Sequence, residues 1–354
     1  MPGARHWAPR ADPADRKVRT PVDARALLDP RVLLVTGKGG VGKSTVAAAL
    51  AIAGVRSGRR TCLVEVEGRQ TMRSLFSTEP WGFDEREVRQ DLFGLSIDPE
   101  ASLAEYLAMF YGARRLSKLV VNSTAVEFAT TAAPGIKDVL LIGKIKEMER
   151  RRDPDGRFVY DLIVVDAPPT GRILNFLRAP EATTELVRIG PVHEQAQSVM
   201  DLLVDPNRLR LQLVTLLEEM PVAETAESAT ALTGFGVGLN PVIANRVLQP
   251  RLDPAAAKVV DAGITHATLR SVLAGSGLDD DASLDALRTL GERHLHRLEL
   301  QDTMRVALRD QIDVPLFELP YLPTRSFAET EVSGLADHVN AVIDPGATSG
   351  RHTS

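Results

Sequence analysis

Cysteine is almost absent from this sequence: Cys62 is the only one in a chain of 354 residues. A lone cysteine excludes an internal disulfide and any metal site made of several cysteines, and it suits a reducing compartment. Because Cys62 lies in an apolar segment, we expect a small buried side chain and not a reactive thiol. No run of about eighteen apolar residues occurs either, so the sequence predicts no transmembrane helix.

A basic excess is also missing, since the formal net charge is −5. Nucleic-acid-binding domains are usually basic, so we expect no specific nucleic-acid partner. Residues 1–29 mix arginines with prolines and aspartates and lack the apolar core of a signal peptide, which indicates a disordered tail. Residues 344–354 are expected to form a second disordered tail. The hydrophobic content of 44% is ordinary for a globular protein. We expect residues 30–343 to form the folded domain.

A glycine-rich segment is the strongest feature that is present. It follows a predicted buried strand, Val32–Thr36, and precedes an alanine-rich helical segment that starts at Val46. Its spacing is that of a phosphate-binding loop (P-loop), in which backbone N–H groups surround a polyphosphate, a lysine reaches the terminal oxygens and a hydroxyl holds Mg²⁺. The alternative is a turn that binds nothing, but glycines beside lysines favour an anion cradle. The residues expected to bind nucleotide here are Gly37, Lys38, Gly39, Gly40, Val41, Gly42, Lys43, Ser44 and Thr45.

Two more apolar segments predict the fold. Thr61–Val66 reads as a buried strand that completes a strand–helix–strand unit, which argues for a parallel sheet. Tyr160–Asp166 is a longer apolar strand that ends on a carboxylate, where P-loop proteins hold Mg²⁺ near the loop hydroxyl. Ser44 and Asp166 are therefore the candidate metal residues, with a solvated strand-end aspartate as the alternative. The expected fold is α/β: a mostly parallel P-loop sheet flanked by helices, with an inserted helical subdomain.

Helical periodicity predicts insertions over approximately residues 99–152 and 180–208. Within the first, Leu103, Leu107 and Phe110 recur at helical spacing and form one apolar face. Such a face either forms a groove for a client protein or packs against the sheet. Amphipathic helices mostly face a core, so packing is the simpler interpretation.

Lys38 narrows the class of P-loop. The form Gly-Lys-Gly-Gly-Val-Gly-Lys-Ser resembles the deviant P-loop of the family that contains the arsenite-pump ATPases, the guided-entry ATPases that carry tail-anchored proteins, and the partition ATPases. The segment from Asp166 to Gly171, Asp-Ala-Pro-Pro-Thr-Gly, resembles the second switch of that family, and the order of motifs fits from Arg31 to Ile343. The long helical stretch between the two switches is most similar to the arsenite-pump and guided-entry branch.

The resemblance implies an ATPase that works as a homodimer or as a heterodimer with a related chain. It implies that Lys38 points across the dimer interface to the partner's nucleotide, that Lys43 binds the terminal phosphates, and that Asp166 supports the Mg²⁺ ion. Asn245, followed by a basic residue, is expected to read the adenine edge, with an asparagine in a turn as the alternative. Pro320 is a further expected nucleotide contact.

One departure from the family pattern concerns catalysis. The first switch of the family reads Asp-Pro-Ala, and its aspartate orients the attacking water; the corresponding residue here is Glu67. Glutamate is one methylene longer, so it can still accept a hydrogen bond from water but would place that water differently. Lys38, Lys43 and Glu67 are the expected catalytic residues. We expect slow hydrolysis, with loss of hydrolysis as the alternative.

Two other departures concern ligands. The arsenite pump binds metalloid and many guided-entry ATPases bind zinc through several cysteines, so neither arsenite nor zinc is expected here. The leading hypothesis is a cytoplasmic, Mg²⁺-dependent ATPase whose nucleotide state changes its shape for handling a client protein, and which a partner brings to the membrane surface. The alternatives are a partition or positioning ATPase, which needs a basic stripe or a membrane-binding tip, and a nucleotide-binding scaffold without turnover that pairs with an active relative.

Overall fold

The computed structural model describes residues 27–66, 70–103, 105, 135–186 and 191–344. Its centre is an eight-stranded sheet in the order β3-β4-β2-β5-β1-β6-β7-β8. All neighbouring strands are parallel except β3 and β4. The expected α/β fold with a mostly parallel sheet is therefore confirmed. The strands are β1 Val32–Gly37, β2 Thr61–Val66, β3 Arg86–Arg89, β4 Leu92–Ile97, β5 Leu162–Asp166, β6 Leu209–Thr215, β7 Val242–Val247 and β8 Leu316–Pro320.

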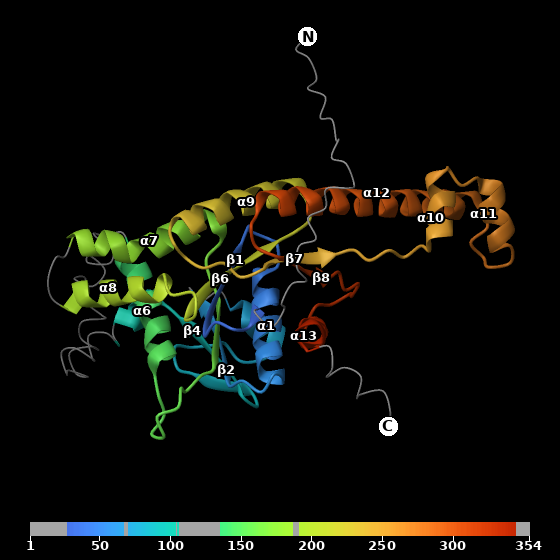
Figure 1. Cartoon of the computed structure of the whole chain (residues 1–354). Coiled ribbons are helices and arrows are strands. Elements are labelled where there is room, and N and C mark those ends of the chain that lie inside the picture. The colour runs from blue at the N-terminus through green and yellow to red at the C-terminus, as the bar shows by residue number, and fades with distance from the viewer. Residues whose placement is uncertain (1–26, 67–69, 104, 106–134, 187–190, 345–354) are drawn as a thin grey trace, which may run out of the picture.

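Helices cover both faces of this sheet (Figure 1). Successive side chains of β1 point to opposite faces, so Val32 and Leu34 belong to one apolar core while Leu33 and Val35 belong to the other. Burial on both faces explains why β1 is a continuous apolar run and not an alternating one. The core that contains Leu33 also includes residues of α1 Lys43–Arg56, α2 Thr71–Phe76 and α13 Glu329–Ile343. The core that contains Val32 includes residues of α6 Ile136–Arg150, α7 Thr170–Leu186, α8 Pro191–Leu203 and α9 Glu219–Gly234.

Several boundaries differ from the sequence-based expectation. The apolar segment Leu95–Asp98 alone predicts a short strand, but β4 already begins at Leu92. The strand β3 precedes it as an antiparallel edge strand across a turn in which Asp91 has a φ of 61°. Likewise, the second helical insertion was expected from approximately residue 180, but α7 begins at Thr170 and continues through Pro180. Cys62 is buried, as expected. Leu107 and Phe110 of the apolar helix face lie outside the described residues.

Three helices form an arm that extends away from the sheet (Figure 1). They are α10 Pro254–Asp261, α11 His266–Leu273 and α12 Asp281–Gln311. The arm has almost no core of its own: α10 and α11 contain no buried residue, and α12 buries only Leu284 and Leu308. Asp280 caps α12 by accepting a hydrogen bond from the Ser283 backbone N–H. None of the helices within the described ranges is both long and apolar enough to cross a membrane.

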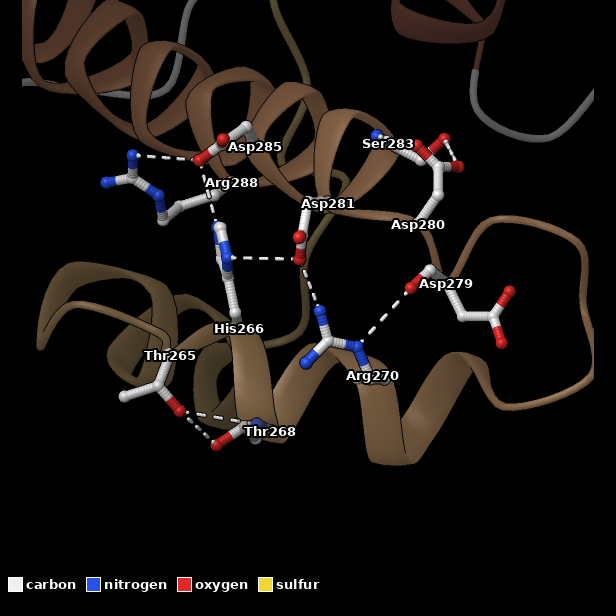
Figure 2. Close-up of polar contacts among 10 residues, drawn as sticks. All are labelled: Thr265, His266, Thr268, Arg270, Asp279, Asp280, Asp281, Ser283, Asp285 and Arg288. Atoms are coloured by element: carbon white, nitrogen blue, oxygen red, sulfur yellow. Dashed lines mark hydrogen bonds and ion pairs between the residues drawn. The ribbon is translucent and has the colours of Figure 1, made fainter.

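Polar contacts hold the far end of the arm together (Figure 2). The His266 ring nitrogen Nε2 lies 2.9 Å from Oδ1 of Asp285, which joins α11 to α12. Arg270 of α11 forms an ion pair with Asp281 at the start of α12. These side chains are all at least one third exposed, so water screens their attraction and the pairs contribute little to overall stability. They do fix the orientation of α11 on α12.

Candidate nucleotide-binding site

The P-loop joins β1 to α1 at the carboxyl edge of the sheet, where ligands bind in parallel α/β folds. At two positions of the loop, neighbouring atoms lie so close that only glycine fits. A Cβ atom on Gly37 would lie 2.1 Å from the carbonyl oxygen of Val214, and one on Gly42 would lie 2.4 Å from Nδ2 of Asn245. Gly42 also has a φ of 92° at the N-cap of α1, and no side chain caps that helix. The first N–H groups of α1 are thus available to an anion.

A hydroxyl and a carboxylate meet beside this loop. Ser44 Oγ donates a 2.6 Å hydrogen bond to Oδ2 of Asp166, the last residue of β5. The pairing of β1 with β5 places Val35 opposite Asp166, which brings the carboxylate level with the start of the P-loop. Asp166 is only 2% exposed. The structure therefore brings together the two residues that the sequence predicted as metal ligands.

The two P-loop lysines have different surroundings. Lys43 is 8% exposed, and its Nζ donates a 3.1 Å hydrogen bond to the carbonyl oxygen of Lys38. The Lys38 side chain is 30% exposed and forms an ion pair of 3.2 Å with Glu224 Oε2 on α9. No local pattern in the sequence marks Glu224, because it lies so far along the chain from Lys38. The hydrogen bond from Thr170, followed by the contact with Lys38, lowers the pKa of Glu224.

The loop that follows Asp166 is anchored at both ends. At its start, Thr36 Oγ1 donates a buried hydrogen bond of 2.6 Å to the carbonyl oxygen of Pro168. At its end, Thr170 begins α7 and donates a 2.5 Å hydrogen bond from Oγ1 to Glu224 Oε1. The loop is therefore connected to β1 on one side and to α9 on the other.

A cavity of about 430 Å³ opens next to the P-loop. Thr45, Asn245 and Pro320 all contribute to its lining, so the structure places two later strand ends beside the P-loop. Asn245 is buried: its Nδ2 donates to the Val41 carbonyl oxygen at 2.9 Å, and its Oδ1 accepts from the Arg246 backbone N–H at 2.9 Å. Its amide thus supports the P-loop in this conformation. The lining also includes Arg246, the basic residue after Asn245, and three residues that the sequence did not mark, Tyr321, Thr324 and Arg325.

Glu67 lies outside the described residues, which end at Val66 and resume at Gln70. Glu65, fully buried in β2, accepts hydrogen bonds from the backbone N–H groups of Gln70 at 2.9 Å and Thr71 at 2.6 Å. Glu65 was not predicted as a functional residue. A carboxylate in an apolar strand does signal a required partner, since a buried charge is costly unless it is paired. Glu65 thereby holds both ends of the segment that contains Glu67.

Comparison with known proteins agrees with this geometry. The family model described as "Anion-transporting ATPase" matches residues 30–200. "ATPase BagA" of Mycobacterium tuberculosis is 43% identical over 300 residues, which cover 82% of this chain and 87% of that protein. "ATPase GET3" of Eremothecium gossypii is 25% identical over 252 residues, which cover 61% of this chain and 71% of that protein. A "putative arsenical pump-driving ATPase" of Prosthecochloris vibrioformis is 23% identical over 261 residues, which cover 62% of this chain and 61% of that protein. The chain that carries this P-loop therefore belongs to the anion-transporting ATPase family and is an ATPase.

Proposed function

We propose that this ATPase requires Mg²⁺ and couples its nucleotide state to a change of shape in a dimer. The hydrogen bond of 2.6 Å between Ser44 and Asp166 beside the P-loop carries the proposal, because it gathers a hydroxyl and a carboxylate, oxygen ligands that suit Mg²⁺. Within the described residues, no group of three or more His, Cys, Asp or Glu side chains could hold a metal ion. Ser44 and Asp166 would therefore share the ion with phosphate oxygens, and Mg²⁺ would neutralise part of the polyphosphate charge.

Each part of the site then has a task. The first N–H groups of α1 and the Lys43 ammonium bind and orient the phosphates, which is the main contribution a P-loop makes to phosphoryl transfer. The cavity lined by Asn245 and Pro320 takes the base. Glu67 orients the attacking water, and Lys38 acts on the nucleotide of the other protomer.

The loop after Asp166 is the proposed link between the nucleotide and the helices. It connects the end of the Mg²⁺-binding strand to the first turn of α7, where Arg172 forms an ion pair with Asp138 of α6 at 3.7 Å. A shift of this loop would therefore move α6 and α7 together. We propose that this movement presents the helical region to a client protein.

The test combines steady-state ATPase activity with mass measurement of the full-length chain, with and without Mg²⁺ and ATP. We expect hydrolysis together with a nucleotide-dependent increase from monomer to dimer mass. Lys43→Ala should lose tight ATP binding in titration calorimetry, because Lys43 supplies the main positive charge at the terminal phosphates. Lys258→Ala, which removes an exposed lysine of α10, is the matched control. Unchanged ATP affinity in Lys43→Ala would refute the P-loop assignment, and an unchanged mass with ATP bound would refute the dimer.

A further inference from the structure

Glu224 joins two parts of the site that are separate in the sequence. Its Oε2 lies 3.2 Å from the Lys38 ammonium of the P-loop, and its Oε1 accepts the 2.5 Å hydrogen bond from Thr170. Thr170 stands at the end of the loop that follows Asp166 and is 5% exposed. One carboxylate of α9 thus bonds both to the P-loop and to the loop that the proposed function makes the link between the nucleotide and the helices.

The chemistry of these contacts resembles that of a bound phosphate. A terminal phosphate in a P-loop accepts hydrogen bonds from a lysine ammonium and from donors in the adjoining loop, and the Glu224 carboxylate accepts from the same two kinds of donor. The Glu224 charge also interacts with Lys43, which is not among its hydrogen-bond partners. The hydrogen bond from Thr170 is the main cause that lowers the pKa of Glu224, and Lys38 and the more distant Lys43 lower it further. Glu224 is therefore ionised at neutral pH.

Two consequences follow for an incoming nucleotide. The Thr170 hydroxyl has a single proton, so it cannot donate to Glu224 and to a phosphate oxygen at the same time. The negative charge of Glu224 also repels a phosphate that approaches Lys38. The contact within one chain further restrains Lys38, which must be free to extend if it is to act on the nucleotide of a partner.

We propose that Glu224 is an internal anion that competes with the terminal phosphate of ATP, for Thr170 with the ATP in its own site and for Lys38 with the ATP of the partner, so that ATP must displace it. This inference rests on the proposed function in taking the P-loop as the phosphate site. It adds a residue that sets the preference between nucleotides: the competition involves the terminal phosphate, so Glu224 weakens ATP binding more than ADP binding.

The first test is Glu224→Gln in the full-length chain with Mg²⁺, measured by titration with ATP and with ADP. Glutamine keeps the shape of the side chain and a carbonyl oxygen for Thr170 but removes the charge. The Lys38 and Glu224 side chains are 30% and 34% exposed, so solvent screens the pair and the expected gain is modest. We expect ATP affinity to rise roughly threefold to tenfold, with a change of less than about twofold for ADP. Glu227→Gln, on an exposed position of the same helix, should change neither affinity.

A double-mutant cycle tests whether Glu224 acts through Lys38. Lys38→Met removes the ammonium, so adding Glu224→Gln to Lys38→Met should raise ATP affinity much less than it does in the wild type. Unchanged or weaker ATP binding in Glu224→Gln, or an equal gain for ATP and ADP, would overturn the inference. An undiminished gain in the Lys38→Met background would overturn the role of Lys38. Lys43→Ala separates these results from the proposed function, since tight ATP binding by Lys43→Ala would refute the P-loop assignment itself, whatever Glu224→Gln shows.

Discussion

Asp166 is a single carboxylate that is almost fully buried and that accepts a hydrogen bond from Ser44. Asp166→Asn keeps the size of the side chain but removes the charge that would support Mg²⁺. We expect the affinity for ATP in the presence of Mg²⁺ to fall about tenfold or more, because loss of an outer metal partner usually costs that much. The affinity measured with a chelator should hardly change. An equal loss under both conditions, measured by calorimetry, would identify Asp166 as a structural residue.

Gly42 is constrained both by its neighbour Asn245 and by its backbone conformation. Gly42→Ala places a Cβ atom 2.4 Å from Nδ2 of Asn245 and forces alanine into a left-handed backbone conformation. Asn245 would have to give up its hydrogen bond to the Val41 carbonyl oxygen. We expect the free energy of unfolding to fall by about 2 kcal/mol, as measured by denaturant titration.

Gly39→Ala is the matched control for stability, because no atom lies within 4 Å of a Cβ built on Gly39. Its free energy of unfolding should stay within about 0.5 kcal/mol of the wild-type value. If both variants are equally stable, the contact between Asn245 and the P-loop does not constrain the loop as the structure indicates.

Among the elements, β2 and α2 are connected by one side chain. Glu65→Gln would replace a buried acceptor of three backbone N–H groups, those of Gln70, Thr71 and Met72, with a group that carries two donors of its own. Hydrogen bonds to a charged group contribute more than neutral ones, so we expect a loss of about 2 kcal/mol in the free energy of unfolding. Amide hydrogen exchange at Thr71 should become faster than at distant positions in the sheet.

The exposed Glu79, close to α2 in sequence, provides the control for this prediction. Glu79→Gln should leave both the free energy of unfolding and the exchange rate at Thr71 unchanged. If Glu65→Gln behaves like Glu79→Gln, then Glu65 does not hold the segment that contains Glu67.

How far the sequence predicts these elements depends on where their partners lie. The P-loop, α1, β2 and β5 were all recognised, because each has a local pattern: glycine spacing, an alanine-rich run, or a continuous apolar strand. The edge strand β3 was missed, since Arg86–Arg89 is short and polar and becomes a strand only by pairing with β4. Glu224 was missed for a related reason, since its contacts with Lys38 and Thr170 exist only after distant segments have packed together. Glu65 was missed although its partners Gln70 and Thr71 are close in sequence, because no local pattern shows which backbone N–H groups a buried carboxylate will accept from.

For the whole molecule, the central prediction concerns Lys38. Lys38→Ala should bind ATP but show reduced turnover and reduced formation of the ATP-dependent dimer, because the proposed target of Lys38 is the nucleotide of the other protomer. Light scattering gives the dimer fraction, and phosphate release gives the turnover. Wild-type values in both measurements would exclude a role for Lys38 across the interface.

The arm described above has a mechanical consequence. With 31 residues, α12 is a rod about 47 Å long, and its C-terminal part lies near the sheet while its start carries α10 and α11 (Figure 1). The same rod packs against α9, the helix that carries Glu224. A rod of this length is a lever: each degree of rotation at its base displaces the far end by about 0.8 Å. A tilt of α9 too small to disturb the packing of the sheet would thus become a displacement of several ångströms at the ion pairs between α11 and α12.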